Sequence, residues 1–367
     1  MTSANSQAIG LHKRDLETPA LCLDLTRYER NVARMVDYIV RRCSIAWRPH
    51  MKGQKAAELA RLAVNAGAIG VTCATVYEAE AMVDAGIQSI LVAHESVGER
   101  KLRRLANMQR RSTVISATDS HEHLAMLAAA AQAEGVVIPV ILELNVGMNR
   151  SGIAPGQPAL DLARKAHATP GIRFLGLMGW EGHVLGFDDA EKKNQTKLSI
   201  TALTATAQLC RDADLPVEIV SSSGSGTFLN AAPLPGITEV QAGGGVFSDK
   251  SYAAWGLEHD FALTIVTRVA SRPSPNRIIV DGGFKTMSKD HGYPEPIGLA
   301  PVKKMVLSAE HGNLELEHPS ETPRVGDIVE FIPGYTDSTV CLHDEMVVLR
   351  DDVVTDVWTI PGRTGRR

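Results

Sequence analysis

The sequence predicts an α/β protein in which a (β/α)8 TIM-like barrel is followed by a C-terminal all-β domain. Eight short apolar runs lie between residue 44 and about residue 245, and Ala/Leu-rich stretches of helical period separate most of them. Beyond about residue 260, apolar runs alternate with turn residues and show almost no helical period. The first pattern is typical of repeated βα units and the second of an antiparallel sheet.

The expected barrel strands are the apolar runs at 44–49, 68–74, 89–94, 112–117, 136–144, 172–180, 217–222 and 237–243. Helices are expected at 54–66, 76–85, 99–108, 121–133, 159–168 and 190–213. Helix C-caps are expected where each helix gives way to a strand, at Gly67, Gly86, Gly135 and Gly171. An open doubly wound sheet shows the same alternation, but the count of eight and the lack of a Gly-rich fingerprint after the first strand favour the barrel.

The C-terminal part is expected to form strands at 261–271, 277–284, 304–310, 313–317, 327–333 and 344–360, with turns between them. The early apolar run 20–25 either opens the barrel or bridges to this second domain. We therefore predict a bridging segment at 1–25, a barrel at 26–258 and a β domain at 259–367.

The composition excludes several classes of protein. The 38 basic and 42 acidic residues give a formal charge of -4 without a long basic tract, so no nucleic-acid partner is expected. No run of 18 apolar residues occurs and the first residues are polar, so neither a membrane span nor a signal peptide is expected. Five scattered cysteines fit reduced thiols. These features predict a cytoplasmic protein with no membrane partner.

Candidate catalytic side chains cluster just after the expected strands, where barrel active sites form. Those after the first strand are Arg48, His50, Lys52 and Lys55, those after the fifth are Asn145, Asn149 and Arg150, and those after the sixth are Trp180, Glu181 and His183. The seventh strand runs into SSSGSGT and the eighth into QAGGGVF.

These last two segments resemble a phosphate cup, because glycine permits close backbone approach and serial N–H groups with serine hydroxyls satisfy a dianion. Each segment alone is also compatible with a flexible Ser/Gly loop, and a lysine alone with a solvated surface residue. A lysine that bonds to an aldehyde, together with a phosphate cup, describes a pyridoxal phosphate site.

The chain resembles the D-threonine aldolase/D-serine dehydratase family of fold-type III pyridoxal phosphate enzymes, which is related to alanine racemase. The resemblance covers nearly the whole chain, and its anchors follow in the family's order. They include ETPALCLDLTRYERNV, RPHMKGQK, LELNVGMNRSG, SSGSG, EVQAGGGVFSDKSY, VDGGFK and PGYTDSTVCLHDEMVVLRDD. Membership implies a barrel, a C-terminal β domain, an amino-acid substrate and commonly a homodimer.

Carried over residue by residue, the resemblance implies that Lys52 holds the cofactor aldehyde and acts as a base near Cα. It implies that Arg150 lies near the cofactor ring and that Gln241 stands where alanine racemases place an arginine on the ring nitrogen. The implied phosphate cradle consists of Ser223, Gly224, Ser225, Gly226, Gly243 and Gly244.

Two departures from the family pattern bear on function. Relatives commonly carry a His-x-Asp or His-x-Cys pair that binds a divalent metal, whereas this chain has Tyr335 and Asp337 there. Asp337 is the retained metal candidate, for Mg or Mn, or for Zn in a dehydratase-like enzyme, and His343 is a further candidate or a structural histidine. The usual catalytic histidine position falls at Gly186, and His183 could replace that histidine.

The resemblance implies a pyridoxal phosphate-dependent lyase that cleaves a β-hydroxy-D-amino acid by a retro-aldol reaction, giving glycine and an aldehyde in the threonine case. His183 is the expected base on the hydroxyl, with Asp337 assisting. A D-serine or 3-hydroxyaspartate dehydratase is the first alternative. A metal-independent racemase that uses Tyr335 as a second base is another, and a non-catalytic cofactor-binding protein is the last.

Overall fold

The computed structural model describes residues 7–363, which divide into two compact units. One unit is Arg34–Gly244, and the other joins the chain up to Ala33 with Gly245–Arg363. We call them the barrel unit and the β unit and describe each by itself. The divisions fall at 33/34 and 244/245, whereas the domain boundaries predicted above lie at 25/26 and 258/259.

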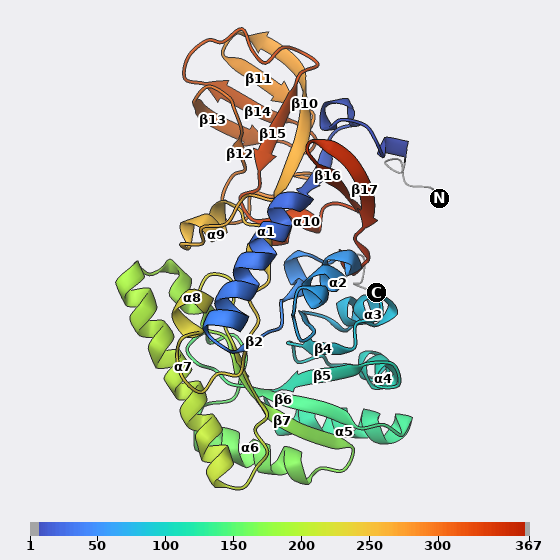
Figure 1. The fold of residues 1–367 in the computed structure, drawn as a ribbon, viewed down its shortest axis with the longest axis vertical. Coiled ribbons are helices and arrows are strands. Elements are labelled where there is room, and N and C mark those ends of the chain that lie inside the picture. Colours follow the sequence, from blue (N-terminus) through green and yellow to red (C-terminus); the bar gives the residue numbers. More distant parts are fainter. Residues whose placement is uncertain (1–6, 364–367) are drawn as a thin grey trace. The chain divides into compact units, whose positions relative to one another are not determined.

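The barrel unit contains eight parallel strands in one curved sheet (Figure 1). In chain order they are β2 (Ala46–Trp47), β3 (Val71–Cys73), β4 (Ser89–Val92), β5 (Thr113–Thr118), β6 (Ile138–Glu143), β7 (Ile172–Gly179), β8 (Ile219–Ser222) and β9 (Glu239–Val240). The sheet order is β2-β9-β8-β7-β6-β5-β4-β3, and an isolated parallel bridge between His50 and Thr72 links its two ends. The predicted TIM-like barrel is confirmed.

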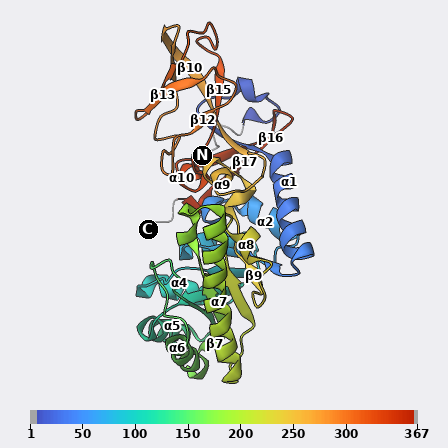
Figure 2. The same cartoon turned by 90° about the vertical axis from the view of Figure 1, so that its left-hand side faces the viewer.

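The helices of the barrel unit lie outside the strands, as Figure 1 shows. They are α2 (Ala57–Asn65), α3 (Val76–Asp84), α4 (Glu99–Met108), α5 (His121–Glu134), α6 (Gln157–Ala168), α7 (Asp189–Asp212) and α8 (Phe228–Ala231). The long helix α7 packs on β7, β8 and α8. In Figure 2 it runs along the near side of this unit. Gly135 ends α5 in the left-handed conformation, as its predicted role as a C-cap requires.

Two helices of this unit begin at a residue whose own side chain caps the helix N-terminus. Thr75 caps α3 by accepting from Glu78 N at 3.1 Å, and Asp188 caps α7 by accepting from Glu191 N at 2.9 Å. Every residue of β6 is buried, which is the pattern of a parallel strand covered on both faces. The apolar interior between strands includes Leu91, Ile115, Ala117, Ile141, Leu175 and Met178.

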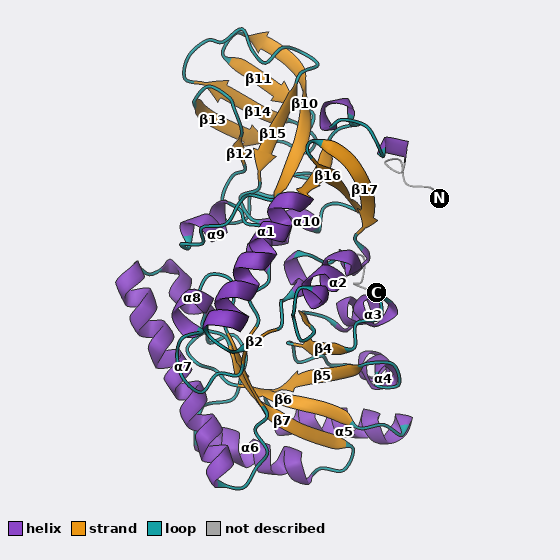
Figure 3. Cartoon of the chain, in the orientation of Figure 1, coloured by secondary structure: helices purple, strands orange, loops and turns teal. Residues whose placement is uncertain are grey.

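The β unit is mostly strand, as Figure 3 shows, and its sheet has the order β13-β14-β11-β10-β1-β16-β17, with β15 paired to both β10 and β12. Its strands are β1 (Ala20–Asp24), β10 (Leu263–Ser274), β11 (Arg277–Val280), β12 (Glu295–Pro296), β13 (Val302–Leu307), β14 (Gly312–Leu316), β15 (Ile328–Ile332), β16 (Glu345–Arg350) and β17 (Val353–Thr359). The predicted C-terminal all-β domain is confirmed. The run 20–25 supplies β1, which pairs with β10 and β16 of this sheet.

Three helices accompany this sheet: α1 (Leu25–Val36), α9 (Lys250–Ala254) and α10 (Thr336–Val340). The chain crosses from the β unit to the barrel unit within α1, a helix that was not among the expected elements. No helix of residues 7–363 combines the length and the apolar character needed to cross a membrane. All five cysteines lie in the described part and none is in a disulfide.

Candidate active site

Lys52 lies directly after the first barrel strand, in the short 3-10 turn Met51–Gly53. Two contacts fix this turn: Lys52 N donates to His50 Nδ1 at 3.2 Å, and Gln54 N donates to Met51 O at 3.0 Å. His50 Nδ1 accepts a hydrogen bond, which requires that this nitrogen carry no proton. The lysine therefore follows an ordered backbone rather than a loose loop.

The loop after β9 packs tightly against this turn. His50 N donates to Gln241 O at 3.0 Å, and Gln54 Nε2 donates to Gly243 O at 3.1 Å. A Cβ on Gly243 would lie 2.2 Å from His50 O and 2.4 Å from His50 N, so only glycine allows this approach. Gly243 of the predicted phosphate cradle thus packs against the turn that contains Lys52, which we call the lysine turn.

The loop after β8 forms the other half of the predicted cradle. Ser223 adopts a left-handed conformation with φ 66°, and its side chain and that of Ser225 are buried. Gln241 N donates to Ser222 O at 3.0 Å, which joins this loop to the one after β9. Buried hydroxyls beside two adjoining Gly-rich turns give a donor set that suits a phosphate group.

Trp180, at the end of β7, joins the separate parts of the predicted site. Lys52 Nζ lies 5.7 Å and Arg150 Cζ 4.9 Å from the centroid of its ring. A Cβ on Gly224 would lie 3.2 Å from Trp180 Nε1, so the N–H edge of the indole borders the loop after β8. The structure therefore brings Lys52, Arg150 and the cradle around one indole ring.

Three cationic side chains at the barrel rim act on His50. Burial, followed by the charges of Lys52, Lys55 and Arg150, lowers the pKa of His50 well below its ordinary value, so this imidazole is neutral at pH 7. Lys55, the other lysine near the first strand, forms an ion pair with Glu78, whose second oxygen accepts from Ala74 N at 2.7 Å. The Lys55 amine is therefore held by a buried carboxylate, which disfavours it as the group that binds an aldehyde.

His183 and Glu181 supply buried polar atoms that have no partner in the described part of the chain. These atoms are His183 Nδ1 and Glu181 Oε1. The His183 ring lies against the loop after β6, since a Cβ on Gly147 would be 2.5 Å from its Cε1. Glu181 is fully buried, and its other oxygen accepts from Ser222 Oγ at 3.1 Å. Unsatisfied buried atoms cost free energy, which a bound ligand could recover.

Below this rim a buried ion pair connects the first and eighth barrel strands. Arg48 Nε lies 2.9 Å from Glu239 Oε1 and 3.1 Å from Oε2, and Arg48 Nη1 donates to Ser89 Oγ at 2.8 Å. Ser221 Oγ donates to Glu239 Oε1 at 2.8 Å and accepts from Gln241 Nε2 at 2.9 Å. Gln241, the expected partner of the ring nitrogen, is thus tied to this network.

A carboxyl pair near Arg150 was not among the expected site residues. Burial and the neighbouring Glu143 raise the pKa of Glu95 to about 8. Glu143 Oε1 accepts from Ser151 Oγ at 2.8 Å and lies 3.5 Å from Arg150 Nη2. Among residues 7–363, the buried atoms Glu95 Oε1 and Glu143 Oε2 have no hydrogen-bond partner, which fits a Glu95 carboxyl that keeps its proton. The one sign of this carboxyl pair in the sequence is its position: Glu95 closely follows β4, and Glu143 ends β6.

We expect the stability of the barrel unit to fall as pH rises from 4.5, the ordinary value for the Glu95 carboxyl, to about 8. Over this range the folded chain keeps a proton that the unfolded chain has released, and one proton contributes a slope of at most about 1.4 kcal/mol per pH unit. Glu95→Gln should flatten the slope, and Glu99→Gln, at an exposed position, should not. Urea unfolding at several pH values, followed by circular dichroism, measures it. Equal slopes in the wild type and Glu95→Gln would show that Glu95 is ionised in the folded chain.

The β unit contains the predicted metal candidate, Asp337. Tyr335 Oη donates to Asp337 Oδ2 at 3.0 Å, and Tyr252 Oη donates to Asp337 Oδ1 at 3.2 Å. His343 Nε2 lies 2.9 Å from Thr286 O, and burial lowers the pKa of His343, as expected for a structural histidine. Within residues 7–363, no three side chains of His, Cys, Asp or Glu gather closely enough to hold a metal ion. These residues therefore do not fit the expected metal.

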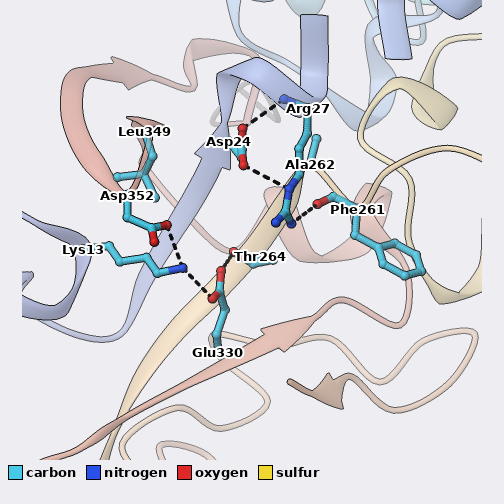
Figure 4. Close-up of a pocket in the computed structure, with 9 residues that line it drawn as sticks. All are labelled: Lys13, Asp24, Arg27, Phe261, Ala262, Thr264, Glu330, Leu349 and Asp352. Carbon is cyan, nitrogen blue, oxygen red and sulfur yellow. Dashed lines mark hydrogen bonds and ion pairs between the residues drawn. The ribbon is translucent and has the colours of Figure 1, made fainter. Parts of the chain in front are cut away.

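A separate pocket of the β unit contains none of the predicted site residues (Figure 4). Lys13 pairs with Glu330 and Asp352, at 2.9 Å each, and Arg27 pairs with Asp24 at 3.0 Å. The remaining lining residues are Phe261, Ala262, Thr264 and Leu349. Each of these five charged side chains lies beside an opposite charge, so none of them needs a ligand as its counter-ion.

Comparison with known families agrees with the division into a barrel and a β unit. Residues 23–251 match the family model "Alanine racemase, N-terminal domain", and residues 262–349 match "Putative serine dehydratase domain". The first match covers more than half of the chain and includes Lys52, Arg150 and both Gly-rich loops.

Several characterised proteins are similar over most of their length. D-threonine aldolase of Arthrobacter sp is 33% identical over 95% of this chain and 93% of the relative. 3-hydroxy-D-aspartate aldolase of Paracoccus denitrificans (strain Pd 1222) is 31% identical over 96% of this chain and 94% of the relative.

Two solved structures are similar over nearly the whole chain. D-threonine aldolase from Filomicrobium marinum superposes with a TM-score of 0.94 and 33% identity, over 98% of both chains. D-threo-3-hydroxyaspartate dehydratase from Delftia sp. HT23 superposes with a TM-score of 0.85 and 26% identity, over 95% of this chain and 98% of that chain. One solved variant of D-threo-3-hydroxyaspartate dehydratase is described as a metal-free form.

The fold, the lysine turn and these matches define an enzyme of the lyase class with an alanine racemase-like fold, and this class implies pyridoxal phosphate as the cofactor. Within it, the chain belongs to the D-threonine aldolase/D-serine dehydratase family. The relatives named here are lyases, which disfavours the non-catalytic cofactor-binding protein considered above.

Proposed function

We propose that this chain cleaves the Cα–Cβ bond of a β-hydroxy-D-amino acid by a retro-aldol reaction, yielding glycine and an aldehyde when the substrate is D-threonine. The observation that carries the proposal is the convergence of Lys52, Arg150 and the loop after β8 on Trp180. Similarity to two aldolases over at least 93% of their length supports the reaction type.

The barrel rim fits pyridoxal phosphate on its own chemistry. Lys52 would bond to the aldehyde, Arg150 would lie beside the ring, and the phosphate would lie between the two Gly-rich turns. Those turns are formed by Ser223, Gly224, Ser225, Gly226, Gly243 and Gly244. When bound, the cofactor stabilises negative charge at the substrate Cα while a bond to that atom breaks.

The chain's own residues then have distinct tasks. Lys52 would hold the aldehyde before substrate arrives and would donate a proton to Cα after the Cα–Cβ bond has broken. His183 accepts the proton of the substrate β-hydroxyl, a role that its buried, unpartnered Nδ1 allows. Arg150 and Lys52 are the cationic side chains that would attract the substrate carboxylate and the phosphate.

His183→Ala is expected to lower kcat by about 10²–10⁴-fold, the range for a positioned acid–base group. Absorption by the bound cofactor should remain, because His183 is not proposed to hold it. His167→Ala, at an exposed position of α6, is the matched control and should keep full activity. Steady-state kinetics with D-threonine measures the effect. A His183→Ala enzyme with unchanged kcat would remove His183 from the reaction.

Dehydration of D-serine or 3-hydroxyaspartate is the second candidate, supported by similarity to a D-threo-3-hydroxyaspartate dehydratase. Racemisation is the third. It would need Tyr335 as a base, yet Tyr335 Oη donates to Asp337, and burial followed by the Asp337 charge raises the pKa of this phenol. A phenol held in its neutral form is a poor base.

Product analysis distinguishes these reactions. D-threonine, 3-hydroxy-D-aspartate and D-serine, with the L-enantiomers as controls, are incubated with the purified protein. We expect glycine and an aldehyde from the D-β-hydroxy substrates. A 2-oxo acid with ammonia would instead establish the dehydratase, and exchange of enantiomers the racemase. We also propose that the protein is a homodimer and is cytoplasmic. Gel filtration with light scattering measures the oligomeric state.

A further inference from the structure

The segment Tyr335–Thr336–Asp337 is built around hydrogen bonds rather than around a cation. Both oxygens of the Asp337 carboxylate accept from phenols, Oδ1 from Tyr252 at 3.2 Å and Oδ2 from Tyr335 at 3.0 Å. We call Tyr252, Tyr335 and Asp337 the phenol cluster. A divalent cation at Asp337 would have to displace these donors, and a carboxylate alone is a poor metal site.

The backbone of the segment is held from a second side. Asp249, fully buried, accepts from both Thr336 N and Thr336 Oγ1 at 2.7 Å, and also caps α9 by accepting from Tyr252 N at 2.8 Å. Ser251 Oγ donates to Gly334 O at 2.8 Å. The same residues therefore orient Tyr252 and the segment together, which fixes the geometry of the phenol cluster.

Aromatic packing surrounds Tyr335. Its ring centroid lies 5.8 Å from that of Tyr252, 6.0 Å from that of Trp255 and 4.7 Å from that of His291. The imidazole of His291, which packs on the Tyr335 ring, is exposed. Its Nε2 lies 4.0 Å from Asp290 Oδ2. The ring environment holds Tyr335 in the orientation in which it donates to Asp337.

We propose that the phenol cluster takes the place of a divalent cation in this chain, and that Tyr335 is the residue that excludes the cation. The chain then binds no divalent cation at Asp337, and its lyase activity needs none. The lack of a cation at Asp337 concerns the β unit by itself, whereas the metal-independence of the lyase activity rests on the proposed function. Imidazole nitrogen paired with a carboxylate is a good donor set for Mn or Zn, so one substitution, Tyr335→His, should create a site.

The test compares the wild type, Tyr335→His and the matched control Tyr335→Phe, each as the full chain loaded with cofactor. Each protein is equilibrated with MnCl2 or ZnCl2, desalted and assayed for bound metal by mass spectrometry. We expect no metal above the blank in the wild type and Tyr335→Phe, and one cation per chain in Tyr335→His. Circular dichroism shows that each variant is folded, and Tyr335→His with Asp337→Asn should lose the cation.

The proposal would be overturned if the wild type bound a cation that Asp337→Asn or His291→Ala did not bind. A folded Tyr335→His protein that gains no metal would also overturn it. Aldolase activity of the wild type should be the same with and without EDTA. Activity that needs added Mn would also overturn it, while leaving the proposed function intact. Conversely, a protein free of metal that cleaves none of the substrates would leave the phenol cluster intact and refute the proposed function.

Discussion

Lys52→Ala is expected to produce a folded protein that cannot retain pyridoxal phosphate covalently and cleaves its substrate at least about 10²–10⁴-fold more slowly, the range for one positioned acid–base group. The substituted side chain lies in the turn Met51–Gly53, whose backbone hydrogen bonds do not depend on the lysine amine. The loss should therefore appear in kcat and in the visible spectrum rather than in stability.

Borohydride reduction followed by peptide mapping gives a readout that is independent of turnover. The wild type should carry the reduced cofactor on Lys52, and Lys52→Ala should carry none. Lys55→Arg is the matched control, because Lys55 lies three positions away and the substitution keeps the charge that pairs with Glu78. A reduced adduct on Lys55 would reassign the covalent site, and a protein that takes up no cofactor would refute the assignment of pyridoxal phosphate.

Arg48→Ala is expected to destabilise the barrel unit by about 3–5 kcal/mol, because it leaves the Glu239 carboxylate buried without its counter-charge. The side chains of Arg48 and Glu239 are only 4% and 2% exposed, so water cannot compensate the charge. Arg111→Ala, which removes an ion pair with side chains 57% and 69% exposed, should cost less than about 1 kcal/mol.

Urea unfolding followed by circular dichroism measures both variants, since the helices α2–α8 all belong to the barrel unit. Removing both charges, with Arg48→Met and Glu239→Leu together, should recover most of the loss, because a buried ion pair gives little net stability over apolar side chains. Equal small losses for Arg48→Ala and Arg111→Ala would show that Glu239 is hydrated in the folded chain.

The barrel, and the strand that each site residue follows, could be predicted from the sequence. Both depend on patterns of residues that are neighbours along the chain. Apolar runs and helical periods locate the strands within a few residues, although β9 covers only Glu239–Val240 of the expected 237–243. Since parallel strands end at the same rim, residues that follow successive strands are brought together in space. Lys52 beside the loops after β8 and β9 follows from that rule.

Contacts between side chains from distant segments could not be predicted in this way. Tyr252 reaches Asp337 across 85 positions, and Arg48 reaches Glu239 across 191. The same is true of the Glu143 carboxyl that raises the pKa of Glu95, and of the ion pair between Lys55 and Glu78. Each depends on side-chain direction and burial after folding, which no local periodicity encodes. Sequence pattern therefore decides the strands and the position of the lysine, whereas tertiary packing decides which charges are paired, buried or left for a ligand.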